Sequence, residues 1–165
     1  NTGRPGPKNP MKLDDIPLEA RQSSLGNSSF YLDSGRDPLF PFGYGLSYTS
    51  FEYTDLKLSA SKIAANQKLT VSVTLKNTGK YAGTEVAQLY IQDIAGSIAR
   101  PVKELKGYQK ISLQPGESKL VTFELSSGDL AFYGLDLVKK AEKGMFNVWV
   151  GGNSDSGLKA SFSLE

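Results

Sequence analysis

Cysteine and histidine are both absent from this sequence. Without these residues the chain has no Ser-His-Asp or Cys-His catalytic arrangement, no zinc finger, and no histidine-bound haem or metal. The absence of cysteine also removes disulfides as an indicator of the cellular compartment, so a periplasmic or secreted location stays open on this ground. Nucleophilic chemistry of the histidine-dependent kinds is therefore excluded within the chain.

Long hydrophobic runs and blocks of like charge are also absent. The apolar runs are only a few residues long, so the sequence predicts no membrane-spanning helix and no membrane partner. The 19 basic and 17 acidic residues are scattered and give a formal net charge of +2, which predicts no nucleic-acid partner. The chain begins at Asn1 without an initiator Met or a signal sequence, and we expect it to be a piece of a longer protein.

Three stretches of different composition follow one another along the 165 residues. Residues 1–37 are rich in Pro, Gly, Asn and Ser without a sustained apolar period, which is typical of an interdomain linker. Residues 38–50 concentrate rings, prolines and glycines, and residues 51–165 consist of short alternating runs separated by turn residues. The length suffices for one domain with a core and an extension.

The stretch 38–50 is interpreted as an aromatic clamp. Its two prolines fix their own φ angles, and each glycine beside a ring permits close backbone approach. We expect its rings to pack between the sandwich and domains that are absent from this chain, and some of them to be exposed here as a result. The alternative is a surface that presents rings to a sugar or a partner. The clamp residues are Pro38, Phe40, Pro41, Phe42, Gly43, Tyr44, Gly45 and Tyr48.

The third stretch, 51–165, predicts an all-β fold, an antiparallel β-sandwich of seven or eight strands of the immunoglobulin or fibronectin type III-like kind. Apolar residues alternate with polar ones from Leu69 to Leu75, which indicates a half-buried strand. Residues 84–92 are apolar on both faces, as in a central strand covered on two sides. The apolar residues change parity near Asp55, which predicts a bulge where a first strand crosses between sheets.

Local signals predict several further elements. Residues 102–113 read as an extended stretch broken at Gly107, and 114–117 as a type II turn. A Ser-rich start at 126–129 predicts a short helix over 130–133. Residues 136–141 and 145–150 are expected to pair as a hairpin, and 160–164 to close the sandwich as a last strand.

Candidate catalytic residues are not identified. Nothing in the sequence pairs two carboxylates at the spacing of about 5 to 9 Å that glycoside hydrolysis needs, so they are interpreted as solvated or capping groups. No metal ligand and no cofactor is predicted. The carboxylates considered are Asp14, Asp15, Asp33, Asp37, Glu104 and Asp129.

Two aromatic residues are weak candidates for sugar contact. Tyr90 and Trp149 would form a platform for a sugar ring if both were exposed and coplanar, but packing between the sheets explains them without a ligand and is favoured. Three lysines, Lys103, Lys106 and Lys110, would bind an anion or, more simply, protect a strand edge from pairing with another chain.

A succession of motifs runs along the chain. The motifs are NTGRP at 1–5, PLFPFGYGLSYTSF at 38–51, NTG at 77–79, VAQLY at 86–90, RPVKELKGY at 100–108, DLAFY at 129–133 and FNVWVG at 146–151. Their order resembles the C-terminal part of family 3 glycoside hydrolases, of the bacterial periplasmic β-glucosidase type, and the resemblance covers nearly the whole chain.

This resemblance implies that 51–165 is the fibronectin type III-like domain of a larger parent enzyme. The parent would carry a catalytic aspartate on a (β/α)8 barrel and an acid/base glutamate on an α/β sandwich domain. Both domains would precede Asn1 and would be the partners of this chain. The parent would hydrolyse a β-glucoside or oligosaccharide by a retaining double displacement, in the periplasm or outside the cell. No catalytic residue of the family maps onto the present sequence.

Two functional hypotheses follow. In the first, the chain is an accessory C-terminal domain that stabilises the catalytic domains of a β-glucosidase and borders the substrate entrance or a dimer interface. In the second, it is an independent carbohydrate-binding or adhesive β-sandwich.

Overall fold

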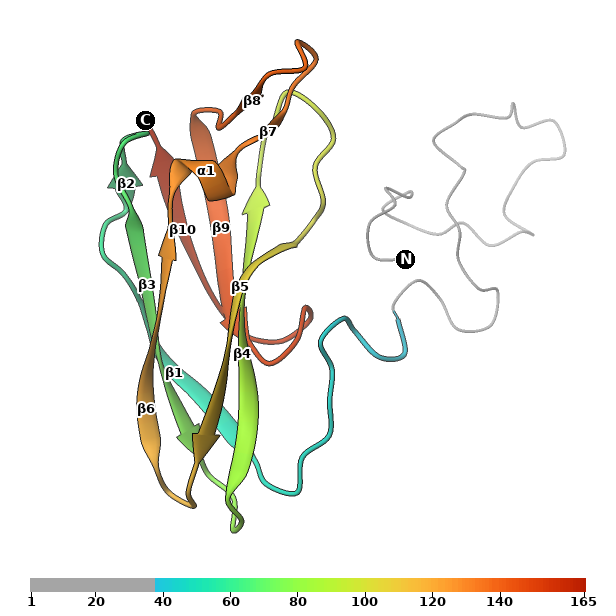
Figure 1. Ribbon diagram of the computed structural model, residues 1–165, viewed down its shortest axis with the longest axis vertical. Coiled ribbons are helices and arrows are strands. Elements are labelled where there is room, and N and C mark those ends of the chain that lie inside the picture. The colour runs from blue at the N-terminus through green and yellow to red at the C-terminus, as the bar shows by residue number, and fades with distance from the viewer. Residues whose placement is uncertain (1–37) are drawn as a thin grey trace, which may run out of the picture. The chain divides into compact units, whose positions relative to one another are not determined.

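The computed structural model describes residues 38–165, and within it residues Pro41–Glu165 form a compact unit. Ten strands and one short helix occur in the described part of the chain (Figure 1). Of the other unit, Asn1–Phe40, residues 38–40 are described; they are exposed and bend at Leu39 and Phe40. The interpretation of 1–37 as a linker lies outside the described residues.

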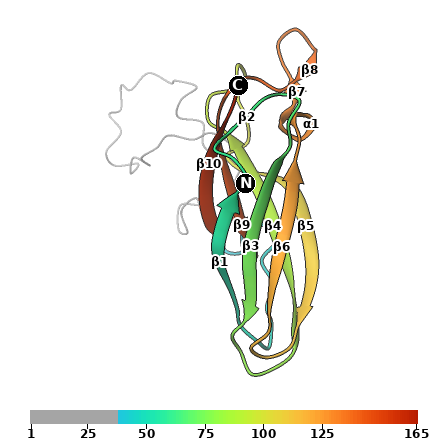
Figure 2. The same cartoon turned by 90° about the vertical axis from the view of Figure 1, so that its left-hand side faces the viewer.

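Two sheets make up the sandwich, and Figure 2 shows them face to face. All strand pairs within them are antiparallel except the short parallel pair of β2 with β10. Seven strands have seven or more residues, so the predicted β-sandwich is confirmed. The first sheet has the order β1 (Phe51–Leu58), β3 (Leu69–Asn77), β6 (Ser118–Leu125). The second has the order β2 (Lys62–Ile63), β10 (Leu158–Leu164), β9 (Gly144–Gly151), β4 (Gly83–Asp93), β5 (Glu104–Leu113).

The core lies between the two sheets and follows from alternation in sequence. On β3 every second side chain from Leu69 to Leu75 is completely buried, as the period of two predicts. On β9 the side chains of Phe146, Val148 and Val150 are buried in the same core. The Phe146 ring stacks on the ring of Phe162 of β10, with the two ring centroids 5.4 Å apart. The predicted strands at 69–75 and 160–164 are confirmed.

The strand β4 is buried on both faces, as its apolar composition predicts. Every residue from Ala87 to Ile91 is buried. Ala87, Leu89 and Ile91 belong to the core between the sheets. Gln88 and Tyr90 alternate with them and lie on the outer face of the five-stranded sheet. What covers this outer face determines the candidate site described below.

The predicted irregularity near Asp55 is confirmed. The register of β1 against β3 shifts between Thr54 and Lys57, and Asp55 has a φ of 55°. The chain joins the second sheet only later, at β2. The break expected at Gly107 is instead a bulge, because β5 continues through it while its register against β4 shifts between Leu89 and Tyr90.

The turn after β5 has the predicted type II geometry. The amide of Glu117 donates to the carbonyl oxygen of Gln114 at 3.0 Å, and Gly116 has a φ of +77°.

The helix predicted at 130–133 is misplaced. The helix α1 (Ser127–Leu130) begins after Ser126, whose backbone amide and hydroxyl donate to the Asp129 carboxylate at 2.7 and 2.6 Å. It ends at Leu130, and the strand β7 (Phe132–Tyr133) follows after Ala131.

Among the described residues no helix is long and apolar enough to cross a membrane.

The predicted hairpin of 136–141 with 145–150 is wrong. The strand β8 (Lys139–Lys140) pairs with β7, and β9 pairs with β4 and β10. The chain reverses at Leu137, which has a φ of 58° and whose amide donates to the Gly134 carbonyl oxygen at 3.0 Å. Sequence patterns did not reveal this turn because leucine seldom adopts a positive φ.

Candidate functional site

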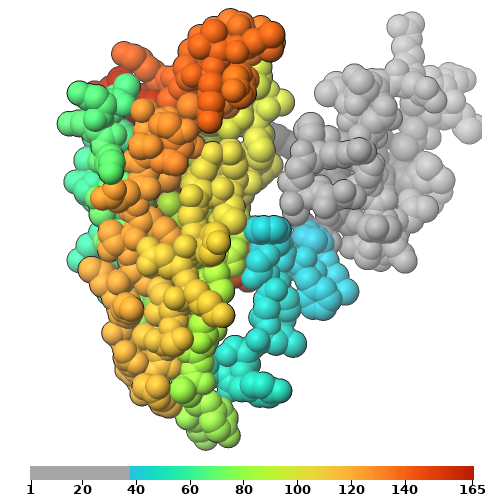
Figure 3. Space-filling model, viewed as in Figure 1, coloured from blue at the N-terminus to red at the C-terminus, as the bar shows by residue number. Residues whose placement is uncertain are grey.

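Residues 42–49, named the arch here, cross the outer face of the sandwich before β1 begins. The carbonyl oxygen of Phe42 accepts a hydrogen bond from the Ser154 amide at 2.9 Å, and that of Gly43 accepts one from Gln88 Nε2 at 3.3 Å. Figure 3 shows this segment at the surface of the molecule beside β4. The first end of the arch is therefore attached to β4 and to the loop between β9 and β10.

Gln88 is the centre of this attachment. It is 5% exposed, and its Nε2 also donates to the Gly152 carbonyl oxygen at 2.5 Å, while its Oε1 accepts from the Tyr90 hydroxyl at 2.5 Å. A Cβ atom on Gly43 would lie 2.2 Å from Gln88 Oε1, and Gly43 has a φ of +81°. Glycine is required at this position because it has no Cβ to collide with Gln88 and because it adopts a positive φ without strain.

Asn77 attaches the second end of the arch. This residue is fully buried at the end of β3, and its Oδ1 accepts from the Thr49 hydroxyl at 2.7 Å and from the Gly79 amide at 3.0 Å. Its Nδ2 donates to the carbonyl oxygens of Tyr81 and Leu113 at 2.8 and 3.1 Å. One buried amide thus joins the arch, the turn after β3 and the end of β5.

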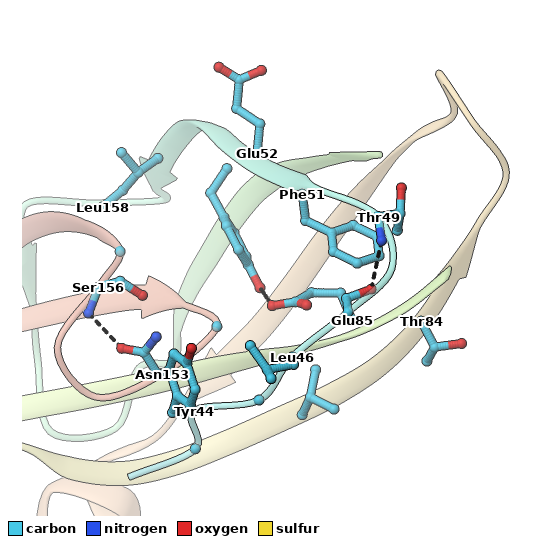
Figure 4. Close-up of a pocket in the computed structure, with 17 residues that line it drawn as sticks. Tyr44, Leu46, Thr49, Phe51, Glu52, Thr84, Glu85, Asn153, Ser156 and Leu158 are labelled. Atoms are coloured by element: carbon cyan, nitrogen blue, oxygen red, sulfur yellow. Dashed lines mark hydrogen bonds between the residues drawn. The ribbon is translucent and has the colours of Figure 1, made fainter. Parts of the chain in front are cut away.

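A cleft of about 770 Å³ lies between the arch and the sandwich (Figure 4). Tyr53 of β1 and Glu85 of β4 meet in it, with the tyrosine hydroxyl donating to Glu85 Oε1 at 3.0 Å. The chain at Gly152 comes so close that a Cβ there would lie 2.4 Å from the same oxygen. The other lining side chains include Tyr44, Leu46, Ser47, Thr49, Phe51, Glu52, Thr84, Asn153, Ser156 and Leu158.

Two carboxylates line the cleft, Glu52, which is exposed, and Glu85, which is partly buried. Burial raises the pKa of Glu85, and the hydrogen bond from Tyr53 only partly offsets this. Burial, followed by the negative charge of Glu85, also raises the pKa of Tyr53. Among residues 38–165 no lysine or arginine lines the cleft.

The rings of the clamp are exposed to different extents. Tyr48 is 98% and Phe42 63% exposed, and Leu46 between them is 89% exposed. Phe40 and Tyr44 are also exposed, and the Pro41 carbonyl oxygen accepts from the Tyr44 amide at 3.0 Å. The expected exposure is therefore observed, whereas the clamp's packing partner remains a proposal.

The two candidate sugar contacts are cross-strand neighbours but do not form an open platform. Tyr90 is 2% exposed, which leaves its ring no free face. Trp149 is half-buried on the outer face, and the Nζ atoms of Lys103 and Lys159 lie 4.9 and 5.2 Å from its ring centroid. The two rings therefore pack on the outer face of the five-stranded sheet, with cation–π contacts at Trp149, and do not lie between the sheets as the sequence analysis favoured.

The described carboxylates considered as catalytic residues have structural partners. Glu104 forms ion pairs with Arg100 and Lys106 at 2.8 and 2.5 Å, and Asp129 accepts the hydrogen bonds from Ser126. The other four, Asp14, Asp15, Asp33 and Asp37, lie outside the described residues. Within residues 38–165 no three metal-ligating side chains form a group.

The three lysines near Tyr108 do not gather into an anion site. Lys103 Nζ donates to the Ser154 carbonyl oxygen at 2.5 Å, and Lys106 pairs with Glu104. Lys110 lies on β5, which is an edge strand of its sheet, in agreement with a role in edge protection.

Three residues of the site, Gln88, Asn77 and Glu85, were not singled out from the sequence. The first two lie in the motifs VAQLY and NTG, so the motifs located them without indicating what they do. A single polar residue inside the otherwise apolar run 86–91 was the available signal for Gln88.

Comparison with known proteins gives a consistent picture. A fibronectin type III-like domain model matches residues 85–154. The chain is 45% identical to a putative β-xylosidase of Formosa agariphila over 94% of its length, and 42% identical to the periplasmic β-glucosidase of Salmonella typhimurium over 99%. It spans only about one fifth, 21% and 20%, of these relatives.

Solved structures give the same result. A β-glucosidase from Listeria innocua in complex with isofagomine superposes on 99% of this chain with a TM-score of 0.81 and 38% identity, and the match covers 22% of that enzyme.

Proposed function

This chain carries a fibronectin type III-like domain whose homologues are family 3 β-glucosidases and β-xylosidases, and on that premise we propose that it is the accessory C-terminal domain of a retaining β-glucosidase. The observation that carries the proposal is the difference between the share of this chain and the share of each relative that the match includes. Similarity extends along 94% and 99% of the chain but includes only 21% and 20% of the relatives. Catalysis is assigned to the remainder of the parent.

The proposed role of the domain is to stabilise the catalytic domains through its arch. Exposed apolar side chains on a rigidly attached segment are typical of an interaction site. Leu46 and Tyr48 are of this kind, and Gln88 and Asn77 hold the segment that carries them. In this proposal residues 38–50 are the clamp between the sandwich and the preceding domains, residues 1–37 are the linker, and residues 51–165 are the domain itself.

A position beside the substrate entrance or at a dimer interface belongs to the same proposal. Comparison of the parent's KM and of its mass in solution, with and without residues 38–165, tests these two positions separately. A higher KM without the domain supports the entrance position, and a change from dimer to monomer supports the interface.

The proposed location of the parent is periplasmic or secreted. Its support is the similarity to the Salmonella typhimurium enzyme, which is named as periplasmic. Cell fractionation of the source organism tests this, and parent recovered only with the cytoplasmic fraction would contradict it.

The parent enzyme provides the direct test of the stabilising role. We expect the full parent to hydrolyse an aryl β-glucoside, and a version that lacks residues 38–165 to lose activity faster on heating. Equal half-lives of inactivation for the two versions would refute the role.

The alternative function, an independent sugar-binding module, has a separate test. Calorimetry of the isolated chain with glucose and cellobiose should show no micromolar binding, because Tyr90 is buried and Trp149 is covered by two lysines. Micromolar binding would favour the module.

A further inference from the structure

Glu85 is a carboxylate in the cleft that has no counterion in the described part of the chain. Its Oε1 accepts from Tyr53, and no ion pair among the described residues includes it. The residue is partly buried at the start of β4, between the arch and the loop at Gly152. Carboxylates in such positions are normally paired, because leaving a desolvated charge without a partner costs free energy.

The walls of the cleft suit a long cationic side chain. Phe51 and Leu158 offer apolar surface on which the methylene stem of an arginine or lysine would pack, while Glu85 offers the charge. Within the described part of the chain no positive group lines the cleft, and its volume of about 770 Å³ leaves room for an incoming side chain. Figure 4 shows Tyr44 and Leu46 of the arch on one side of Glu85 and Phe51 of β1 on the other.

We propose that this cleft receives an arginine or lysine side chain from the part of the parent protein outside this chain, with Glu85 as its counterion. The inference rests on the proposed function, since it assigns the partner to the same parent. It extends that function by specifying a charged contact beneath the arch in addition to the apolar contacts of Leu46 and Tyr48.

A sugar is the rival ligand for this cleft. Sugar sites present an open aromatic face together with several hydrogen-bonding groups. The cleft has an exposed ring, Tyr44, and polar side chains such as Ser47 and Asn153, but the Tyr53 hydroxyl is already engaged with Glu85. The cation is favoured because it would neutralise the charge of Glu85, which a sugar would not, and the titration below separates the two ligands.

The test compares how one substitution shifts the melting temperature of the isolated chain and that of the parent, because the proposal predicts shifts that differ in direction. The variant Glu85→Gln keeps an acceptor for Tyr53 but removes the charge. In the isolated chain its melting temperature should be unchanged or higher, because a desolvated charge without a partner is lost. In the parent its melting temperature should fall by about 2 °C or more, because the cation is then left without its counterion.

A matched control is Asp155→Asn, which removes an exposed carboxylate that does not line the cleft. It should have no effect in either protein. If Glu85→Gln shifts the melting temperature of the isolated chain and that of the parent in the same direction, the cleft proposal is overturned. If the parent still hydrolyses an aryl β-glucoside, the proposed function survives that result, whereas a parent without such activity would refute the proposed function itself.

A second measurement uses the unmodified chain and does not depend on the folding of a variant. Titration with N-acetylarginine amide at millimolar concentrations, followed by amide NMR shifts, should perturb Tyr53, Glu85 and Gly152, and cellobiose should not. No perturbation by the arginine derivative overturns the proposal, and perturbation of the same residues by cellobiose alone replaces it with a sugar site.

Discussion

Two buried amide side chains, Gln88 and Asn77, fix the arch at its two ends. Each is fully hydrogen-bonded through both polar atoms, and each joins segments that are distant in sequence. Satisfied buried amides of this kind specify one arrangement of the chain, because any other arrangement leaves a desolvated polar group. The two ends of the arch, which carries the exposed Leu46 and Tyr48, are therefore fixed to the sandwich within this chain.

The two glycines of the arch provide a matched pair of variants. Gly43→Ala should destabilise the chain by about 1 to 3 kcal/mol, because alanine is strained at a φ of +81° and its Cβ would overlap Gln88 Oε1. Gly45→Ala should change the free energy of unfolding by less than about 0.5 kcal/mol, since nothing lies within 4 Å of its Cβ position. Urea denaturation measures both, and equal effects would contradict this account of the attachment.

The stability of the isolated chain should depend on pH through Glu85. Burial raises the pKa of Glu85 in the folded state above its unfolded value, so the folded state binds the proton more tightly. The resulting stabilisation is complete below the unfolded pKa and is lost as pH rises through the folded pKa.

The variant Glu85→Gln isolates this contribution from those of other groups. Its free energy of unfolding, relative to the unmodified chain, should increase as pH rises from about 4 to 7, because the variant has no carboxyl group to ionise. Urea denaturation at several pH values measures the difference. A difference independent of pH, or one that falls with pH, would disagree with a raised pKa.

Among the elements, those with strict alternation were predictable. Leu69 to Leu75 on β3 and the turn at Gly116 follow from local rules, namely the period of two and the need for a positive φ. The pairing of β8 with β7 instead of β9 was not predictable, because it depends on a leucine with a positive φ. Gln88 was equally hidden, since its partners Gly43 and Gly152 are brought to it only by the fold.

The short helix α1 should depend on Asp129. Its carboxylate accepts from the amide and the hydroxyl of Ser126, so Asp129→Ala should destabilise the chain by about 0.5 to 2 kcal/mol. Asp155→Ala, at an exposed loop position, is the control and should be nearly neutral.

The effect of Asp129→Ala should also diminish at low pH. Burial raises the pKa of Asp129, but the hydrogen bonds from Ser126, together with the positive charge of Lys106 and a backbone hydrogen bond, bring the pKa below its ordinary value. Stability from this group is therefore present above the unfolded pKa and lost as pH falls through the folded one. Urea denaturation near pH 2 and near pH 7 measures this, and the same loss at both would exclude the carboxylate as the cause.

At the level of the whole molecule, the sandwich buries its own hydrophobic core between two sheets, whereas its arch exposes the apolar side chains of Leu46 and Tyr48. Sequence patterns were sufficient for the sandwich, because burial between two sheets imposes a period that can be read locally. They were insufficient for the arch, because the function proposed for Leu46 and Tyr48 depends on domains that this chain does not contain.

Tyr48 distinguishes the role of the clamp from ordinary surface exposure. Since it is 98% exposed, Tyr48→Ala should change the stability of the isolated chain by less than about 0.5 kcal/mol. In the parent the same change should lower the melting temperature, because the ring is proposed to be buried against another domain. Tyr81→Ala, at an exposed tyrosine outside the arch, should be neutral in both, and neutrality of Tyr48→Ala in the parent would argue against the clamp.

The central claim, that the chain is an accessory domain and that catalysis resides in the rest of its parent, is tested most directly by one activity measurement. Purified residues 1–165 and the parent enzyme are assayed with an aryl β-glucoside under the same conditions. The account predicts turnover by the parent and none by the isolated chain. Turnover by the isolated chain that disappears when one of its own carboxylates is replaced would contradict it.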